Sequence, residues 1–378
     1  MKILLIGEYS RLHNSLKEGL ESLGIQVTLA GFRDDFKNYP VDIVFKERYN
    51  TGLPLFFKKS IYKLTGIDVT SRNIEKQFNQ KKKLLTGFDC VQLINENPFN
   101  TVPKTEKRLL EYIFSHNKKV FLLSCGTDYI SVKYAFNKQF RYSIYTPYEA
   151  GKISKSVFWH VLKWQTPPLK TLHKFVFKNI AGVIASDLDY HIPLQNHKQY
   201  LGMIPNPINV DKLPFQNTAV TDKIVIFHGI NSRNFYKKGN DIFKEALAII
   251  KSKYAQHVDI IEVENLPYSQ YIESYNRAHI ILDQVYAYDQ GYNALEAMAK
   301  GKVVFTGAET EWLTHYHLAP NTIAINALPN ATHIADKIEW LIENPEQLQI
   351  IGKNARAFIE KEHHYTRIAK RYLQHWQD

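Results

Sequence analysis

The most constraining feature of this sequence is a repeated alternation of short apolar runs with stretches that carry the 3.6-residue spacing of a helix. It begins with an apolar run at 2–7, a helical stretch at 15–23 and a second apolar run at 25–30. Because neighbouring parallel strands need a crossover, usually a helix, this order predicts a βαβ start and a parallel sheet. Further strands are predicted in the first half at 41–45, 90–95, 120–124 and 180–186.

The second half repeats this alternation at closer spacing. Strands are predicted at 223–229, 258–263, 280–283 and 303–306, and helices at 240–251, 269–277 and 292–300. The chain has 378 residues, too many for one core, so we expect two α/β domains, 1–206 and 207–361. The boundary is set by Pro205 and Pro207, which stiffen an extended connection and forbid helix. After Pro329 the pattern is helical, with a break at Pro345.

Positive charge is concentrated in the first half. Residues 1–206 hold 30 Lys and Arg against 17 Asp and Glu, a net charge of +13, whereas residues 207–378 hold 18 against 20, a net charge of −2. Basic clusters at 56–63 and 81–83 are typical of segments that meet an anionic membrane. No nucleic-acid-binding motif accompanies the charge, so nucleic acid is not expected as a partner. A solvated basic surface without a partner is the alternative.

The sequence predicts a soluble, cytoplasmic protein. No apolar run reaches the roughly 18 residues of a membrane span, and no small-residue cleavage site follows the apolar start. The two cysteines, Cys90 and Cys125, cannot form a zinc site by themselves and suggest a reducing compartment.

The loop at 228–239 carries the strongest local signal for a ligand. It follows a predicted strand and precedes a predicted helix, where open parallel sheets bind their ligands. Arg233 can hold two phosphate oxygens with its planar guanidinium, and Lys238 adds a compact charge, as a diphosphate requires. A basic surface loop without a ligand is the alternative. The first loop, 7–14, lacks the GxGxxG spacing, which disfavours an NAD or FAD enzyme.

A second motif at 289–304 makes the pattern specific. It contains a glycine turn, a short helix, a second glycine and a strand, with the sequence Glu-Ala-Met-Ala-x-Gly-Lys-x-Val beginning at Glu296. Together with the Arg-x4-Lys-Gly loop, it resembles the nucleotide-binding half of the retaining GT-B glycosyltransferases, the family 4 group (group 1 glycosyltransferases). The resemblance implies two Rossmann-like domains facing each other across a cleft, with a C-terminal helix, 362–378, crossing back to the first domain.

The resemblance also assigns donor-binding roles. Arg233 and Lys238 would bind the donor phosphates, and Glu296 would bind the ribose hydroxyls, a role that suits a carboxylate facing vicinal hydroxyls. Backbone amides near Gly291 and Tyr292 would bind the diphosphate at a helix start.

Other matched segments concern the base and the donor sugar. The loop around Leu266 resembles the segment whose backbone contacts the base. Where the family has a glutamate that contacts the donor sugar, this chain has Tyr288, with Asp289 one place further on. This departure leaves open whether Asp289 substitutes, whether the sugar is held differently, or whether activity is lost.

Candidates for the acceptor side of the cleft follow strands of the first half. Asp128 is the first choice for a catalytic carboxylate. The alternative role for this residue is a helix cap. His13, on the first loop, is expected either to orient donor or acceptor or to be structural, and Glu96 and Asn97 are weaker candidates. The segment 187–189 has the Asp-x-Asp spacing of a metal motif, but we interpret Asp187 as a helix start because Arg233 and Lys238 already supply positive charge.

The resulting hypothesis is a metal-independent, retaining glycosyltransferase without a cofactor. Its expected partners are a nucleotide-diphosphate sugar, a saccharide or lipid-linked acceptor, and an anionic membrane surface at the inner face of the cytoplasmic membrane. The expected setting is bacterial surface polysaccharide or glycolipid synthesis. A nucleotide-sugar 2-epimerase of the same fold and a non-catalytic sugar-nucleotide or polyanion-binding module are the alternatives.

Overall fold

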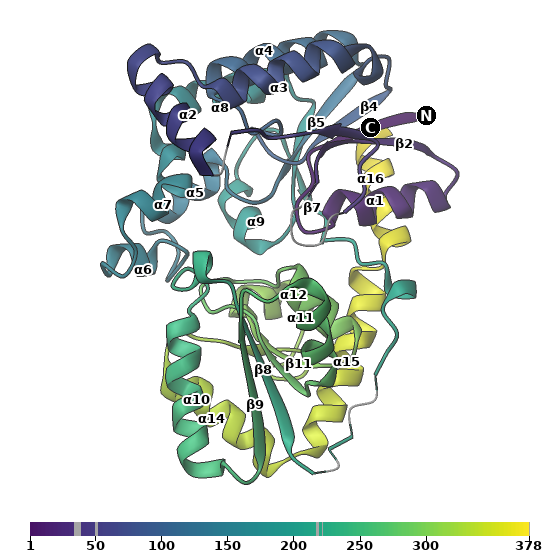
Figure 1. The fold of residues 1–378 in the computed structure, drawn as a ribbon. Coiled ribbons are helices and arrows are strands. Elements are labelled where there is room, and N and C mark those ends of the chain that lie inside the picture. Colours follow the sequence, from purple (N-terminus) through teal and green to yellow (C-terminus); the bar gives the residue numbers. More distant parts are fainter. Residues whose placement is uncertain (34–38, 50–51, 217–218, 221, 378) are drawn as a thin grey trace.

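The computed structural model describes residues 1–33, 39–49, 52–216, 219–220 and 222–377. They form two parallel β-sheets, each flanked by helices and placed one above the other in Figure 1. The seven-stranded sheet has the order β3-β2-β1-β4-β5-β6-β7, and the five-stranded sheet has the order β12-β11-β10-β8-β9. We call the first sheet with its helices the first lobe and the second sheet with its helices the second lobe.

The first lobe contains strands β1 to β7 and helices α1 to α9. Its strands are β1 (Lys2–Ile6), β2 (Gln26–Phe32), β3 (Ile43–Phe45), β4 (Cys90–Leu93), β5 (Lys119–Ser124), β6 (Gly182–Ala185) and β7 (Tyr200–Met203). Its helices are α1 (Leu12–Ser22), α2 (Gly52–Thr65), α3 (Val69–Lys81), α4 (Pro103–His116), α5 (Tyr129–Phe136), α6 (Thr146–Glu149), α7 (Lys155–Leu162), α8 (Pro167–Asn179) and α9 (Leu188–Leu194).

The second lobe contains the remaining strands and all the later helices but the last. Its strands are β8 (Ile224–Ile230), β9 (Val258–Glu264), β10 (Ile280–Leu282), β11 (Val303–Thr306) and β12 (Ile325–Asn326). Its helices are α10 (Asn240–Tyr254), α11 (Tyr268–Arg277), α12 (Tyr292–Ala299), α13 (Thr310–Tyr316), α14 (Ala331–Glu343) and α15 (Glu346–Glu362), followed by α16 (Tyr365–Gln377). Short 3-10 turns lie at 82–85, 163–165, 210–212 and 232–234.

The sheets follow the apolar pattern of the sequence. Residues Ile3–Ile6 are fully buried, because a parallel strand covered by helices on both faces has no solvent-exposed side. The order of strands reverses between β1 and β4 in the first sheet and between β10 and β8 in the second. Such switch points open a crevice at the carboxyl ends of the strands, so the loops after these four strands are placed to bind ligands. The predicted α/β fold with two Rossmann-like units is confirmed.

The last helix lies on the first lobe. Figure 1 shows α16 beside α1, whereas α15 runs along the second lobe. The indole nitrogen of Trp376 donates to Gln92 Oε1 (3.1 Å), and Arg371 donates to the carbonyl of Met203 (2.8 Å). At the connection between the lobes, Ile208 forms a parallel bridge with His364. The chain therefore passes between the lobes twice, side by side, near Ile208 and His364.

No helix of the described residues is long and apolar enough to cross a membrane.

Candidate active site

The loops after β8 and β9 and the start of α12 surround a hollow of about 670 Å³ in the second lobe, which we call the donor hollow. Arg233, Lys238, Leu266 and Tyr292 line it, and Ser10 closes it from the first lobe. Two cations, the predicted base-contacting segment and the first residue of a helix therefore meet at one switch point. This arrangement suits an anionic ligand, because backbone amides at a helix start add to the positive charge.

Lys238 is held in place by both its backbone and its side chain. Gly239 has φ +74°, and a Cβ there would lie 2.6 Å from the Val285 side chain, so only glycine fits after Lys238. The Lys238 ammonium donates to Asp283 Oδ1 (3.0 Å), which also accepts from Asn293 Nδ2 (3.0 Å). Asp283 is 3% exposed, so this buried carboxylate fixes the position of the lysine.

Arg233 stands on a fixed turn with its side chain exposed. Asn231 Oδ1 accepts from the Arg233 backbone N–H (3.0 Å), and Asn265 Oδ1 accepts from the N–H of Ser232 (3.1 Å). The loops after β8 and β9 are thus tied together. The guanidinium is therefore carried on an ordered backbone at the wall of the donor hollow.

Glu296 lies one turn further along α12, beside tyrosines at the edge of the donor hollow. Burial and the nearby Glu296 carboxylate raise the pKa of Tyr268 and of Tyr271, and Tyr271 lines the hollow. Burial and Glu296 also raise the pKa of Tyr39 in the first lobe. Glu296 is therefore near the loop that is predicted to contact the base, but it is not among the residues that line the hollow.

A second hollow of about 560 Å³, the cleft hollow, is lined by residues of both lobes. Ser10, Asn234 and Lys238 line both hollows, so the two are contiguous. Lys237 adds another cation, and burial together with the Lys238 charge lowers the pKa of Lys237 to about 8.

Three carboxylates also line the cleft hollow: Asp187 and Asp189 from the start of α9 and Asp289 from the loop before α12. Burial raises the pKa of Asp289 to about 6, and burial and the neighbouring Asp289 raise the pKa of Asp189 to about 7. Burial and both neighbours raise the pKa of Asp187 well above its usual value. The cleft therefore holds carboxyl groups that ionise near neutral pH.

The same carboxylates join the lobes. Asp189 Oδ1 accepts from the backbone N–H of Tyr288 (3.2 Å), and Asp289 Oδ2 accepts from the N–H of Leu188 (3.2 Å). These reciprocal contacts tie the start of α9 to the loop before α12. Within the described residues, no group of three or more His, Cys, Asp and Glu side chains is placed to hold a metal ion.

The raised pKa values predict how stability depends on pH. A carboxylate with a pKa raised from 3.8 to about 7 by folding stabilises the folded state at low pH, and this contribution is lost as pH rises through about 7. We expect Asp189→Asn to remove part of this loss, because the amide does not ionise. Between pH 5.5 and 8, the Tm of the wild type should fall by about 3 °C more than the Tm of Asp189→Asn.

The control for this prediction is Asp336→Asn, which changes an exposed carboxylate of α14. It should follow the wild-type pH profile. Parallel profiles for Asp189→Asn and the wild type would contradict ionisation of Asp189 in this pH range.

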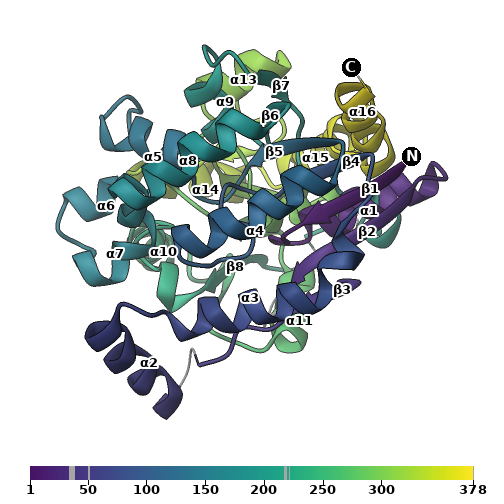
Figure 2. The same cartoon turned by 90° about the horizontal axis from the view of Figure 1, so that it is seen from above.

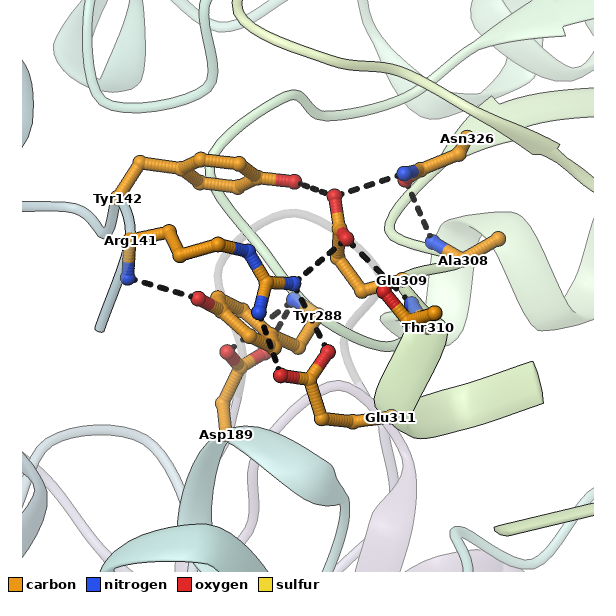
Figure 3. Close-up of polar contacts among 9 residues, drawn as sticks. All are labelled: Arg141, Tyr142, Asp189, Tyr288, Ala308, Glu309, Thr310, Glu311 and Asn326. Atoms are coloured by element: carbon orange, nitrogen blue, oxygen red, sulfur yellow. Dashed lines mark hydrogen bonds and ion pairs between the residues drawn. The ribbon is translucent and has the colours of Figure 1, made fainter. Parts of the chain in front are cut away.

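Tyr288, the residue that departs from the resembled motif, is engaged in a contact between the lobes (Figure 3). Its hydroxyl accepts from the Arg141 N–H (2.9 Å), and the Arg141 guanidinium lies 4.8 Å from the centre of its ring. Arg141 also forms ion pairs with Glu309 (2.7 Å) and Glu311 (2.6 Å), and the Tyr142 hydroxyl donates to Glu309. Tyr288 is 2% exposed and does not line the cleft hollow, so it contributes to the contact between the lobes.

A third hollow of about 920 Å³, the first-lobe cavity, lies at the carboxyl ends of β1 and β4. It shares Tyr9, Thr127 and His160 with the cleft hollow. Glu8 Oε2 accepts from the N–H of Asn14 (2.8 Å), whereas the buried Glu8 Oε1 and Asn97 Oδ1 have no partner among the described residues. Burial raises the pKa of Glu8 to about 7. The cavity thus offers unpaired polar atoms next to the cleft.

The two predicted catalytic residues do not line these hollows, although Thr127, next to Asp128, lines two of them. Asp128 is 3% exposed and caps α5: one carboxylate oxygen accepts from the Ser131 N–H (2.7 Å) and the other from Ser124 Oγ. His13 is fully buried, with Nδ1 2.7 Å from the carbonyl of Gly7, and burial lowers its pKa to about 4. The capping and structural alternatives describe their contacts, since neither residue lines a hollow.

The structure brings several of the predicted site residues together, and other residues that line the same hollows were not predicted. Arg233, Lys238, Leu266 and Tyr292 share the donor hollow, and Gly291 and Asp289 line the cleft hollow beside Lys238. Glu8, His160 and Lys237 were not singled out, and Asp187 and Asp189 were considered only as a metal motif and set aside. Asp187 does begin a helix, as predicted, with its Oδ1 accepting from the Asp189 N–H (3.1 Å). Ligands of open parallel sheets bind beyond the carboxyl ends of the strands, and this rule, which selected Arg233, also applies to Asp187 and Asp189 because both follow β6.

Comparisons with known proteins agree with this architecture. Residues 232–374 match a family model described as glycosyl transferase-like. Among solved structures, sucrose-phosphate synthase from Thermosynechococcus elongatus is 16% identical, with a TM-score of 0.64 over 100% of this chain and 98% of that one. Anabaena HepE in complex with UDP-glucose is 13% identical, with a TM-score of 0.57 over 100% and 99% of the two chains.

An epimerase has the same fold. UDP-GlcNAc 2-epimerase from Neisseria meningitidis, bound to UDP-GlcNAc, is 12% identical, with a TM-score of 0.52 over 99% of each chain. No protein with a curated description matches the chain. The chain therefore has the GT-B fold, and its residues 232–374 match the glycosyl transferase-like family model.

Proposed function

We propose that this protein transfers a sugar from a nucleotide-diphosphate sugar to a hydroxyl group of a saccharide or lipid-linked acceptor. The main support for this proposal is that Arg233 and Lys238 line the same hollow and that this hollow is contiguous with the cleft hollow between the lobes. A diphosphate bound at these cations leaves the donor sugar in the cleft hollow. The first-lobe cavity, which joins the cleft at Tyr9, Thr127 and His160, then receives the acceptor.

The proposed reaction retains the anomeric configuration and uses no metal ion or cofactor. Arg233, Lys238 and Lys237 stabilise the charge that develops on the leaving diphosphate, and the walls of the cleft position the sugar. Glu8 lines the first-lobe cavity, and its Oε1, which has no partner in the part of the chain that the structure describes, can accept from an acceptor hydroxyl. We place this activity in bacterial surface polysaccharide or glycolipid synthesis, at the inner face of the cytoplasmic membrane.

The donor assignment is tested by a thermal-shift panel of UDP, GDP and ADP sugars. We expect one nucleotide family to raise Tm, because a ligand at 100 times its dissociation constant stabilises the fold by about 2.7 kcal/mol. The shift should shrink in Glu296→Ala and persist in Glu273→Ala, a residue of the neighbouring helix α11. No shift with any of the three families would contradict the proposal.

An epimerase is the second candidate. Asp187, Asp189 and Asp289 line the cleft hollow, and burial raises the pKa of Asp189 to about 7 and that of Asp289 to about 6, so these two carboxyl groups can move protons on a bound sugar. Transfer is favoured by the cavity of about 920 Å³ that continues from the cleft into the first lobe, since epimerisation needs no acceptor. Exchange of the proton at sugar C2 with deuterated water, without an acceptor, would reverse this preference.

A further inference from the structure

Helix α2 exposes large apolar side chains to solvent. Leu64 is 84% exposed, Phe56 is 67% exposed and Phe57 is 61% exposed, and Ile61 and Tyr62 are exposed as well. Figure 2 shows α2 projecting from the body of the protein next to α3. Phe57, Ile61 and Leu64 are four and three residues apart, so they form one apolar stripe on the helix. A concentration of exposed apolar groups on one element marks an interaction site.

Lysines surround this stripe, and we call α2 with the adjoining side of α3 the α2 face. Lys59 and Lys63 are exposed on α2, and Arg72 and Lys76 of α3 border the apolar groove described next. At the far end of α3, Lys83 is exposed and Leu84 is 61% exposed. Basic and apolar groups side by side are typical of helices that lie in the interface of an anionic bilayer.

An apolar groove of about 570 Å³ runs between α2 and α3. Pro54, Phe57, Ile61 and Val69 line it, together with the side chains of Lys58 and Arg72. Tyr49 lines both this groove and the first-lobe cavity, so a hydrocarbon-lined space adjoins a polar one. Such a pair of spaces matches a molecule with a polar head group and a hydrocarbon tail.

We propose that the α2 face docks the protein on an anionic lipid bilayer and so presents the first-lobe cavity to a membrane-embedded, lipid-linked acceptor. The apolar stripe enters the interface, and the lysines contact lipid phosphates. The acceptor part of this inference rests on the proposed function, whereas the docking does not. Docking at α2 brings the mouth of the polar cavity near Tyr49 to the head-group layer.

Sedimentation of the full chain with lipid vesicles tests the docking. We expect binding to vesicles of phosphatidylglycerol and phosphatidylcholine, little binding to phosphatidylcholine alone, and weaker binding at high salt. The variant Phe57→Ser/Leu64→Ser should lower the partition coefficient by about tenfold or more, and so should Lys59→Glu/Lys63→Glu. The matched control is Ile350→Ser/Lys353→Glu, which changes one exposed apolar and one exposed basic residue of α15 and should bind like the wild type.

The outcomes separate the docking from the proposed function. Because all substituted side chains are exposed, the variants should keep the wild-type Tm and its shift with nucleotide sugars. Absence of binding to anionic vesicles, or equal binding by the α2 variants, would overturn the docking even if the donor shift persists. A wild-type dimer in analytical ultracentrifugation that Phe57→Ser/Leu64→Ser dissociates would assign the face to a second copy of the chain instead.

Discussion

Arg233→Ala is expected to lower kcat/KM for the nucleotide sugar by about 100- to 1,000-fold, as the loss of one donor that stabilises a developing negative charge typically does. The guanidinium is exposed on a turn fixed by Asn231 and Asn265, so its removal disturbs little of the fold. Nucleoside diphosphate release measured against donor concentration gives the effect directly. Lys at this position should restore only part of the rate, because an ammonium lacks the planar fork.

The matched control is Arg277→Ala, which removes an exposed arginine of α11 whose side chain is 64% exposed and lies 3.9 Å from Asp259. It should leave kcat/KM unchanged. Equal rates for Arg233→Ala and the control would show that the loop at 228–239 does not hold the leaving group.

Arg141→Ala is expected to destabilise the protein by about 1–3 kcal/mol, because it leaves a buried carboxylate without its cation. The Glu309 side chain is 6% exposed, whereas that of Arg141 is 50% exposed, which keeps the effect below that of a fully buried pair. The change also removes the cation from the ring of Tyr288. Denaturant unfolding measures the loss.

Two further variants test which contact accounts for the loss of stability in Arg141→Ala. Tyr288→Phe keeps the ring but loses the hydroxyl that accepts from the Arg141 N–H, and it should cost about 0.5–1.5 kcal/mol. Arg108→Ala breaks a surface pair with Glu75 within the first lobe and should cost less than about 1 kcal/mol. If Arg141→Ala costs no more than Arg108→Ala, the contact in Figure 3 does not hold the lobes together.

Most strands, and most helices of the second half, could be predicted because each carries its own periodicity. The predicted helices at 240–251 and 269–277 are confirmed as α10 and α11, and the strand at 303–306 has the observed bounds. Two strands were missed for a physical reason. β12 has only two residues, and β7 is partly exposed and contains Gly202 at φ +117°, so neither shows a continuous apolar run.

Helix α2 was seen in the sequence only as a basic and apolar cluster. Besides the stripe of Phe57, Ile61 and Leu64, it carries Phe56 and Tyr62 on other sides, so the sequence does not show the single apolar face from which a helix is usually inferred.

In the candidate site, too, local patterns could be predicted from the sequence, whereas contacts between distant residues could not. Arg233 and Lys238 could be proposed from the sequence because both lie in one loop directly after one strand, which is a local pattern. The contact of Asp189 with Tyr288 joins residues 99 positions apart on different lobes, and no local pattern encodes it. Asp128 has the residue type of a catalytic carboxylate, but one of its oxygens caps α5, as the alternative interpretation of the sequence allowed, and the other accepts from Ser124, a contact that only the packing reveals.

A crystal structure of the protein with a nucleoside diphosphate would test the central claim most directly. The account predicts that the diphosphate lies in the donor hollow, within hydrogen-bond distance of Arg233 and Lys238, with the base beside Leu266. A nucleotide found in the first-lobe cavity, with both cations turned to solvent, would contradict it.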